Sequence, residues 1–134
     1  MNIVVGYDGS EPARRALQRA AALAGPDDSV TVVAVFELRA EPVLTEGAQL
    51  DPSEWIKQRE RLEQARAFLA ERGIAADTVL GQGDPADAIL KVAKERGAEL
   101  IVVGHSGHSP LHMLLGSVSH KVAHRAECDV LIVR

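Results

Sequence analysis

Glycines and a serine with the spacing of a phosphate-binding loop occupy the last third of the sequence. Gly104 and Gly107 follow an apolar run that ends at Val103, and after eight further residues Gly116-Ser117 opens a helical pattern. Glycines at a strand end let backbone N–H groups approach an anion, and a helix N-terminus adds positive potential. The pattern favours binding of a phosphorylated ligand, a nucleotide first of all. Its alternative is a helix cap preceded by ordinary turn glycines.

Asp8 is the acidic residue best placed to contact such a ligand. It follows the first apolar run of the chain, and Gly104 follows the fourth. In a doubly wound sheet, ligands bind outside the carboxyl ends of the strands, where the strand order reverses. We expect Asp8 and Gly104 to lie there, with Asp8 also the best candidate for a Mg²⁺ ligand. Alternatively, Asp8 forms an Asx turn that caps the first helix with Gly9 and Ser10, and the two roles are compatible.

Five β-branched apolar runs alternate with four helical patterns and form the frame that must position these residues. Nearly continuous apolar strands are typical of a sheet covered on both faces, and the alternation predicts parallel strands with right-handed crossovers. We therefore predict an α/β fold, a doubly wound parallel sheet with helices on both faces. The strands are expected over Ile3–Tyr7, Val30–Phe36, Asp77–Leu80, Leu100–Val103 and Val130–Val133.

The helices are predicted from apolar spacing together with start and stop residues. They are expected after the cap Ser10, over about 53–72 with Gly73 as stop, from Asp84-Pro85 to near Gly97, and from near Ser117 to before Asp129. The segment from Gly81 to Ala86 also fits Gly-x-Gly-x-x-Ala, a dinucleotide-binding pattern. We interpret it as a turn and an N-cap, because Pro85 lacks an N–H for a pyrophosphate and Asp84 adds negative charge.

Other residue types that often carry chemistry are assigned no catalytic role. The P-loop lysine that contacts outer phosphates is missing, since no Gly-Lys-(Ser/Thr) sequence occurs. His120 and His124 are one helical turn apart, a spacing able to hold a metal, but Lys121 stands where a zinc protease has glutamate. We therefore predict no metal site and no catalytic residue, and we interpret Cys128 as a buried small hydrophobe.

Length, charge and cysteine content limit the class of protein. The 134 residues suffice for a single domain, 1–134, with its own core. A net charge of −4 without a basic stripe argues against nucleic-acid binding. No apolar stretch reaches the ~20 residues of a membrane span, so we expect no membrane partner. The single Cys128 favours a reducing cytoplasm, and because the first apolar run follows Met1 almost directly, we expect no signal peptide.

Together these motifs resemble the universal stress protein family in its small single-domain form. The resemblance covers the whole chain and implies a five-stranded sheet of order 3-2-1-4-5, a role in stress survival and pairing of two copies through the last strand. Many members bind ATP through a Gly-x2-Gly-x9-Gly-(Ser/Thr) loop, whereas others lack that loop and bind no nucleotide. The matching segments are Ile3–Ser10, Gly81–Pro85, Leu100–Gly104, Gly116–Ser119 and Cys128–Val133.

The resemblance also implies a set of binding residues. Asp8 would contact the nucleoside, Val35 would line the adenine pocket and Val118 the phosphate loop, although both valines fit a core position equally well. The implied cofactor-binding set is Gly6, Asp8, Val35, Gly104, Gly107, Gly116, Ser117 and Val118.

Two departures from the family pattern affect this expectation. Eight residues rather than nine separate Gly107 from Gly116, a difference that is either absorbed around Ser109-Pro110 or moves the phosphate cradle out of register. Cys128-Asp129 stands where the family often has Cys-Pro, which alters the entry to the last strand.

The loop and the resemblance predict an adenine-nucleotide-binding regulatory protein that takes ATP or AMP, with Mg²⁺ possible, and has little or no turnover. Two alternatives stay open: a slow ATPase, and a stress protein that binds no nucleotide and acts through dimer contacts. We also expect a homodimer through the C-terminal strand, because an apolar sheet edge such as Val130–Val133 is a hazard unless it is paired or covered.

Overall fold

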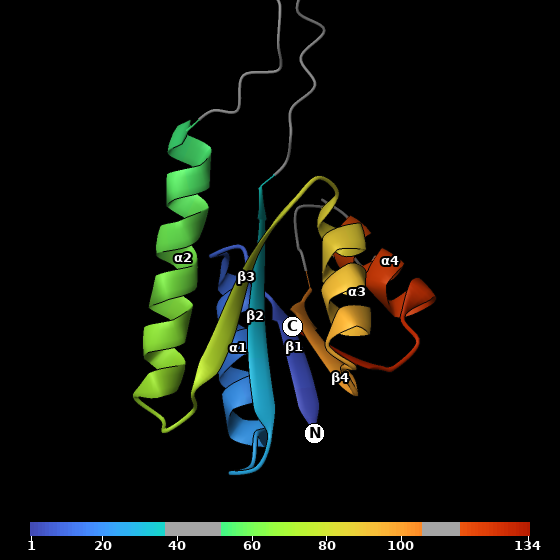
Figure 1. The fold of residues 1–134 in the computed structure, drawn as a ribbon. Coiled ribbons are helices and arrows are strands. Elements are labelled where there is room, and N and C mark those ends of the chain that lie inside the picture. Colours follow the sequence, from blue (N-terminus) through green and yellow to red (C-terminus); the bar gives the residue numbers. More distant parts are fainter. Residues whose placement is uncertain (37–51, 106–115) are drawn as a thin grey trace, which may run out of the picture.

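A computed structural model describes residues 1–36, 52–105 and 116–134, which form a five-stranded parallel sheet in the order β3-β2-β1-β4-β5 (Figure 1). The predicted α/β class and strand order are thereby confirmed. The strands are β1 (Asn2–Gly6), β2 (Ser29–Phe36), β3 (Ala76–Gln82), β4 (Leu100–Gly104) and β5 (Asp129–Val133). The helices are α1 (Glu11–Leu23), α2 (Pro52–Ala70), α3 (Pro85–Glu95) and α4 (Ser117–Arg125).

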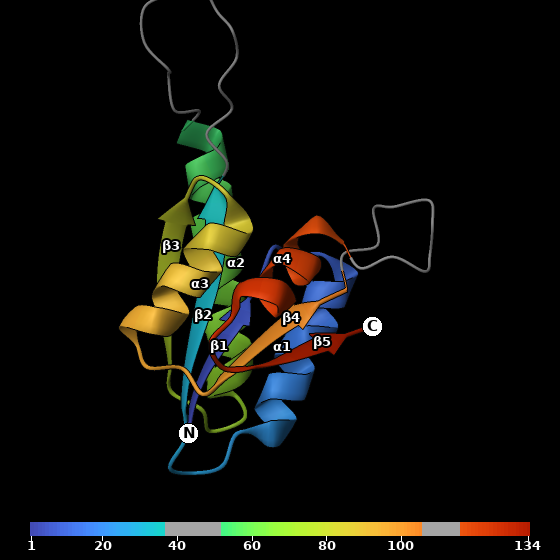
Figure 2. The same cartoon turned by 90° about the vertical axis from the view of Figure 1, so that its right-hand side faces the viewer.

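The helices cover both faces of the sheet, as predicted. α1 packs on β1, β4 and β5, and α2 packs on β2 and β3. From the opposite face α3 covers β1, β2 and β3, while α4 packs against α3 and β5. Figures 1 and 2 show the resulting three layers, with the sheet between the two helix pairs. None of the helices in the described part of the chain is long and apolar enough to cross a membrane.

Alternate side chains of each strand point to opposite faces and fill two separate apolar clusters. On β1, Ile3 and Val5 belong to the cluster beneath α1 and α2, whereas Val4 belongs to the cluster beneath α3 and α4. From Ile3 onward β1 is fully buried, and so is the interior of β4. The two central strands are thus held firmly side by side, and their carboxyl ends form a fixed base for a site.

The helix ends predicted from the sequence are confirmed by hydrogen bonds and backbone angles. Ser10 caps α1 and Asp84 caps α3, each by accepting the backbone N–H three residues further on, at 3.3 and 3.0 Å. Gly73 follows α2 with a φ of 77°, which favours glycine. β3 extends beyond its expected end at Leu80 to Gln82, because it pairs with β2 along its whole length.

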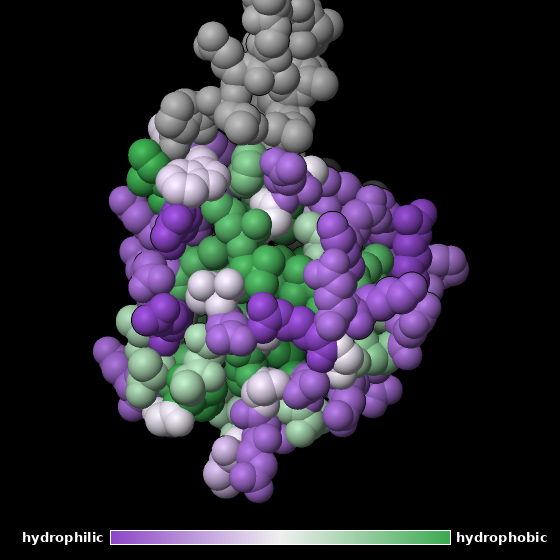
Figure 3. Space-filling model, in the orientation of Figure 1, coloured by the Kyte–Doolittle hydropathy of each residue, from purple (hydrophilic) through white to green (hydrophobic). Residues whose placement is uncertain are grey.

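Both edge strands of the sheet carry apolar side chains that are partly exposed. Val79 and Leu80 lie on β3, and in the view of Figure 1 apolar surface gathers over β3 and β2, between α2 and α3 (Figure 3). On β5 the partly exposed side chains are those of Val130, Leu131 and Ile132. An edge strand presents unpaired backbone N–H and C=O groups, so each edge offers a place for another chain to pair.

Candidate functional site

The carboxyl ends of β1 and β4 lie side by side at the centre of the sheet, where the strand order reverses. Val5 is in register with Val102, and each strand ends at a glycine, Gly6 or Gly104. β1 leads to α1 on one face, and β4 leads across residues 105–116 to α4 on the other. Asp8 and Gly104 therefore follow the carboxyl ends of two neighbouring central strands, which is the position expected for a ligand crevice in this class of fold.

Asp8 forms the Asx turn considered in the sequence analysis. Its Oδ1 accepts the Ser10 backbone N–H at 2.9 Å, and the carboxylate is exposed at the end of β1. Ser10 in turn caps α1. A carboxylate has two oxygens with several acceptor positions, so this turn leaves capacity for a ligand hydroxyl or a cation.

Gly104 is required by packing, a reason that the sequence did not reveal. A Cβ at this position would lie 2.5 Å from the carbonyl carbon of Pro12, 2.6 Å from its oxygen and 2.8 Å from the nitrogen of Ala13. These are backbone atoms of the first turn of α1, which cannot rotate away as a side chain can. The helix start is therefore seated directly on the end of β4, and the phosphate role of Gly104 stays a prediction.

Gly6 also permits a close approach, in this case by α3. A Cβ there would lie 2.8 Å from Cδ1 of Ile89 and 3.2 Å from Cγ1 of Val103. Because these are side-chain atoms, the conflict is milder than at Gly104. Packing accounts for Gly6, and a ligand contact by this residue is not needed to explain it.

The start of α4 provides backbone donors without a side-chain cap. Gly116 is buried at the N-cap position and makes no side-chain capping hydrogen bond, and Ser117 is exposed at the first helical position. Ser119 is fully buried and donates to the Gly116 carbonyl at 3.1 Å, which fixes the turn. The first N–H groups of α4 and the Ser117 hydroxyl are thus available to an anion.

The two valines implied by the family resemblance lie in the apolar core. Val35 and Val118 are both partly buried and pack against the cluster beneath α3 and α4. This packing is the alternative given for them above. Gly107, Ser109 and Pro110 lie outside the described residues. Of the predicted phosphate loop, the structure describes Gly104, Gly116 and Ser117.

Two polar residues of α2 approach this region and carry no motif that sequence reasoning detects. The Arg61 side chain passes over Gly9, next to Asp8. Gln58, one turn earlier on α2, is buried, and its Oε1 has no hydrogen-bond partner within the described part of the chain. Charged and polar residues are common on an exposed helix, so only the packing of α2 against the sheet distinguishes these two.

Asp84 has the capping role predicted for it, whereas Cys128 is only partly buried rather than buried as expected. The backbone N–H of Asp87 and the ammonium of Lys121 lower the pKa of Asp84 below its ordinary value of 3.8. Lys121 bridges Asp84 and Asp87, each at 3.0 Å, and so joins α4 to α3. Cys128 packs against the cluster beneath α3 and α4, and this partial burial raises the pKa of its thiol.

The paired histidines of α4 stack with each other. The ring centroids of His120 and His124 are 6.3 Å apart and the rings are nearly parallel. Within residues 1–36, 52–105 and 116–134, no group of three or more His, Cys, Asp or Glu side chains is arranged to hold a metal.

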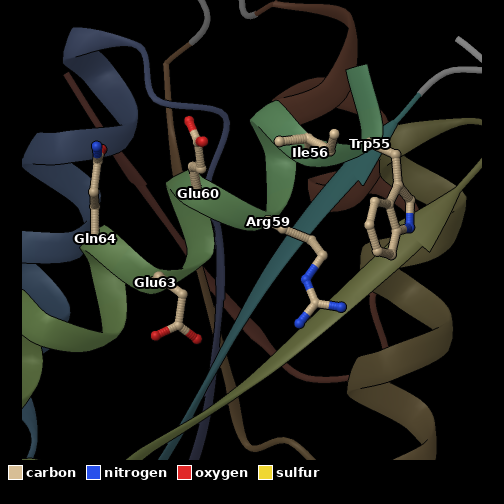
Figure 4. A pocket seen from close by; sticks show the side chains of 6 residues that line it. All are labelled: Trp55, Ile56, Arg59, Glu60, Glu63 and Gln64. Carbon is tan, nitrogen blue, oxygen red and sulfur yellow. The ribbon is translucent and has the colours of Figure 1, made fainter. Parts of the chain in front are cut away.

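A shallow hollow lies along the outer side of α2, away from the predicted binding residues. All the side chains that line it come from this one helix (Figure 4). Trp55 and Ile56 are exposed there, and the Arg59 guanidinium lies 4.9 Å from the centroid of the Trp55 ring. Its residues are Trp55, Ile56, Arg59, Glu60, Glu63 and Gln64. This hollow offers no strand end, glycine turn or helix start, so it is a poor match for a phosphorylated ligand.

Comparison with known proteins gives a consistent result over the whole chain. The model of the universal stress protein family matches residues 1–134. The universal stress protein YxiE of Bacillus subtilis is 38% identical over 146 aligned residues, covering 98% of this chain and 97% of that protein.

Two similar proteins were solved with adenine nucleotides. A universal stress protein in complex with cAMP is 29% identical, with a TM-score of 0.78 and coverage of 100% of this chain and 97% of that one. The universal stress protein from Archaeoglobus fulgidus in complex with dAMP is 28% identical, with a TM-score of 0.73 and coverage of 100% and 98%. The motifs, the sheet order and the full-length family match agree, and this chain belongs to the universal stress protein family.

Proposed function

We propose that this protein binds an adenine nucleotide, ATP or AMP, at the carboxyl edge of β1 and β4 and regulates the stress response with little or no turnover. The observation that carries the proposal is that Asp8 and Gly104 follow neighbouring strands where the strand order reverses, while α4, the next helix in the chain, begins without a side-chain cap. The cAMP and dAMP complexes of similar proteins support adenosine monophosphates as the ligand class.

In this proposal the binding residues have separate tasks. Asp8 accepts hydrogen bonds from the nucleoside and is the candidate ligand for Mg²⁺ when ATP is bound. Gly104, Gly107, Gly116 and Ser117 form the phosphate cradle, in which the Ser117 hydroxyl donates a hydrogen bond to the phosphates. Gly6, Val35 and Val118 shape the pocket from the core side.

We extend the proposal to the assembly and compartment of the protein. Residues 1–134 act as one domain that pairs through β5, where three apolar side chains are partly exposed. The single cysteine favours a cytoplasmic location.

Thermal unfolding with ATP or AMP, each with and without Mg²⁺, tests the proposal together with calorimetry. A ligand that binds the native state raises the melting temperature.

Ser117→Ala should weaken nucleotide binding by about 1.5–3 kcal/mol, the worth of one charge-assisted hydrogen bond. Ser29→Ala, at the amino end of β2 and so at the other end of the strands, is the matched control. A wild-type protein with no thermal shift and no heat of binding at millimolar nucleotide would favour the alternative that acts through dimer contacts, which the short Gly107–Gly116 spacing also suits.

A further inference from the structure

Arg61 differs from the other arginines that the structure describes. It is partly buried, whereas the other nine are exposed. Seven of those nine lie against a carboxylate or an aromatic ring, namely residues 14, 15, 59, 66, 72, 96 and 125. Among the described residues Arg61 has neither kind of partner. A guanidinium stays protonated in proteins, so its charge is retained without an internal counterion.

The charged side chain of Arg61 lies over Gly9. Nε of Arg61 lies 2.9 Å, and its Cδ 3.1 Å, from the point where a Cβ on Gly9 would stand. Gly9 has a φ of 79° and connects Asp8 to the cap of α1. The absent side chain therefore lets an arginine from α2 reach the turn at the carboxyl end of β1, where the nucleotide site is proposed.

Asp8 does not neutralise Arg61, although it is next to Gly9 in the sequence. Its Oδ1 accepts the Ser10 N–H, and no ion pair between Asp8 and Arg61 occurs in the described turn. The guanidinium lies beside the Gly9 turn, and its N–H donors have no partner among the described residues. Planar forked donors of this kind match phosphate oxygens in a bidentate geometry.

The adjacent turn of α2 is also unusually polar for a packed surface. Gln58 is 5% exposed; its Nε2 donates to Glu54 at 3.0 Å, while its buried Oε1 accepts no hydrogen bond from the residues that the structure describes. Residues three apart lie on the same side of a helix, so Gln58 and Arg61 share this side of α2. A buried polar group without a partner is rare, so this turn of α2 differs from a surface that serves packing alone.

We propose that Arg61 binds a phosphate group of the nucleotide and sets the preference for phosphorylated over unphosphorylated adenosine. This inference rests on the proposed function and adds a residue from α2 to a site otherwise built from the ends of β1 and β4 and the start of α4.

Calorimetric titration of Arg61→Gln with adenosine, AMP and ATP tests the inference. Affinity for AMP and ATP should fall about 10- to 100-fold relative to the wild type, as expected for loss of a bidentate charged contact, while adenosine affinity stays unchanged. Arg66→Gln, an exposed position of the same helix that is paired with Glu63, is the matched control and should bind all three ligands like the wild type. Arg61→Lys keeps the charge without the fork and should recover part of the AMP affinity.

A salt series provides a readout that a merely structural role would not change. AMP binding by the wild type should weaken as NaCl rises, and that dependence should be shallower in Arg61→Gln because one charge contact is lost. Equal losses for adenosine and AMP, or no loss for AMP, would overturn the inference while leaving nucleotide binding intact. A wild-type protein that binds none of the three ligands would instead overturn the proposed function. If Arg61→Gln does not fold, Arg61→Lys decides the matter by the same comparison of AMP with adenosine.

Discussion

At the scale of single residues, the two glycines that border the start of α1 are required for different reasons. Gly9 adopts a left-handed backbone angle and carries the Arg61 side chain above it. Gly104 has no such angle, but the backbone of Pro12 and Ala13 occupies the space of a side chain. Sequence reasoning interpreted Gly104 as a phosphate-loop residue. The contact with α1 shows that packing alone already favours glycine at this position, because any side chain would force β4 or α1 to shift.

Gly104→Ala should lower the free energy of unfolding by about 3 kcal/mol, because either β4 or α1 must shift to relieve the backbone contact. Urea denaturation of the ligand-free protein measures this loss. Gly25→Ala is the control, since its Cβ would meet only an Asp28 carboxylate oxygen at 3.4 Å, an ordinary contact. Equal stability of the two variants would show that the start of α1 yields easily, contrary to the packing described above.

At the scale of elements, α3 is secured at its first turn by both local and long-range contacts. Asp84 caps the helix through the Asp87 N–H and also meets Lys121 of α4 at 3.0 Å. The pKa of Asp84 is therefore lower in the folded protein than in the unfolded chain. Its charge stabilises the fold at pH values above the unfolded pKa, and this stabilisation disappears as pH falls through the folded pKa.

Asp84→Ala should cost about 1 kcal/mol at neutral pH, because both the cap and the charge are lost. Asp84→Asn keeps a cap acceptor and should lose less. The difference in stability between the wild type and Asp84→Asn should shrink as the pH falls from above the unfolded pKa of Asp84 through its lower folded pKa, because the wild-type carboxyl group then becomes protonated in both states. Urea denaturation over a pH series checks this, and a constant difference across the series would contradict a stabilising charge on Asp84.

At the scale of the whole molecule, the sheet leaves two apolar edges, and only one of them was anticipated. β5 was expected to pair with a second copy because it ends the sheet. β3 ends it on the other side and also exposes apolar surface (Figure 3). Ile132 on β5 and Val79 on β3 are both partly buried members of the cluster beneath α3 and α4, so they offer equivalent positions for comparing the two edges.

Ile132→Lys should convert a dimer into a monomer, whereas Val79→Lys should leave the dimer intact. Each substitution places a charge on an edge strand, and a charged edge disfavours pairing with another chain. Light scattering should give twice 14.3 kDa for the wild type and for Val79→Lys. The opposite result would assign the dimer to β3, and a wild-type monomer at micromolar concentration would refute pairing through either edge.

Catalysis should be weak in the intact protein. The sequence has no P-loop lysine, and the proposed site contains no assigned general base. Turnover of ATP should therefore lie far below the ~10 s⁻¹ of a median enzyme. Phosphate release from ATP, with Asp8→Ala as the comparison, measures it. Sustained hydrolysis near that rate in the wild type, lost in Asp8→Ala, would identify the protein as an ATPase instead.

The sequence by itself determined the features that depend on near neighbours in the chain. Apolar periodicity gave the strands and helices, and the caps Ser10 and Asp84 were readable because each bonds a backbone N–H three residues away. The parallel order followed from the βαβ alternation, since each crossover has a fixed hand. The same strand order predicted that Asp8 and Gly104 follow neighbouring strands at the carboxyl ends of the sheet.

Tertiary structure alone decided the contacts between elements that no periodicity encodes. The approach of Pro12 to Gly104, the passage of Arg61 over Gly9 and the bridge from Lys121 to Asp84 each join residues far apart in the chain. Their residue types are unremarkable in sequence, because an arginine or a lysine on a helix is usually a solvated group. Whether such a side chain meets solvent, a carboxylate or a glycine turn is set by how the helices pack on the sheet. For that reason the loops in the sequence predicted a candidate site, and only the fold brought Arg61 of α2 over the Gly9 turn beside it.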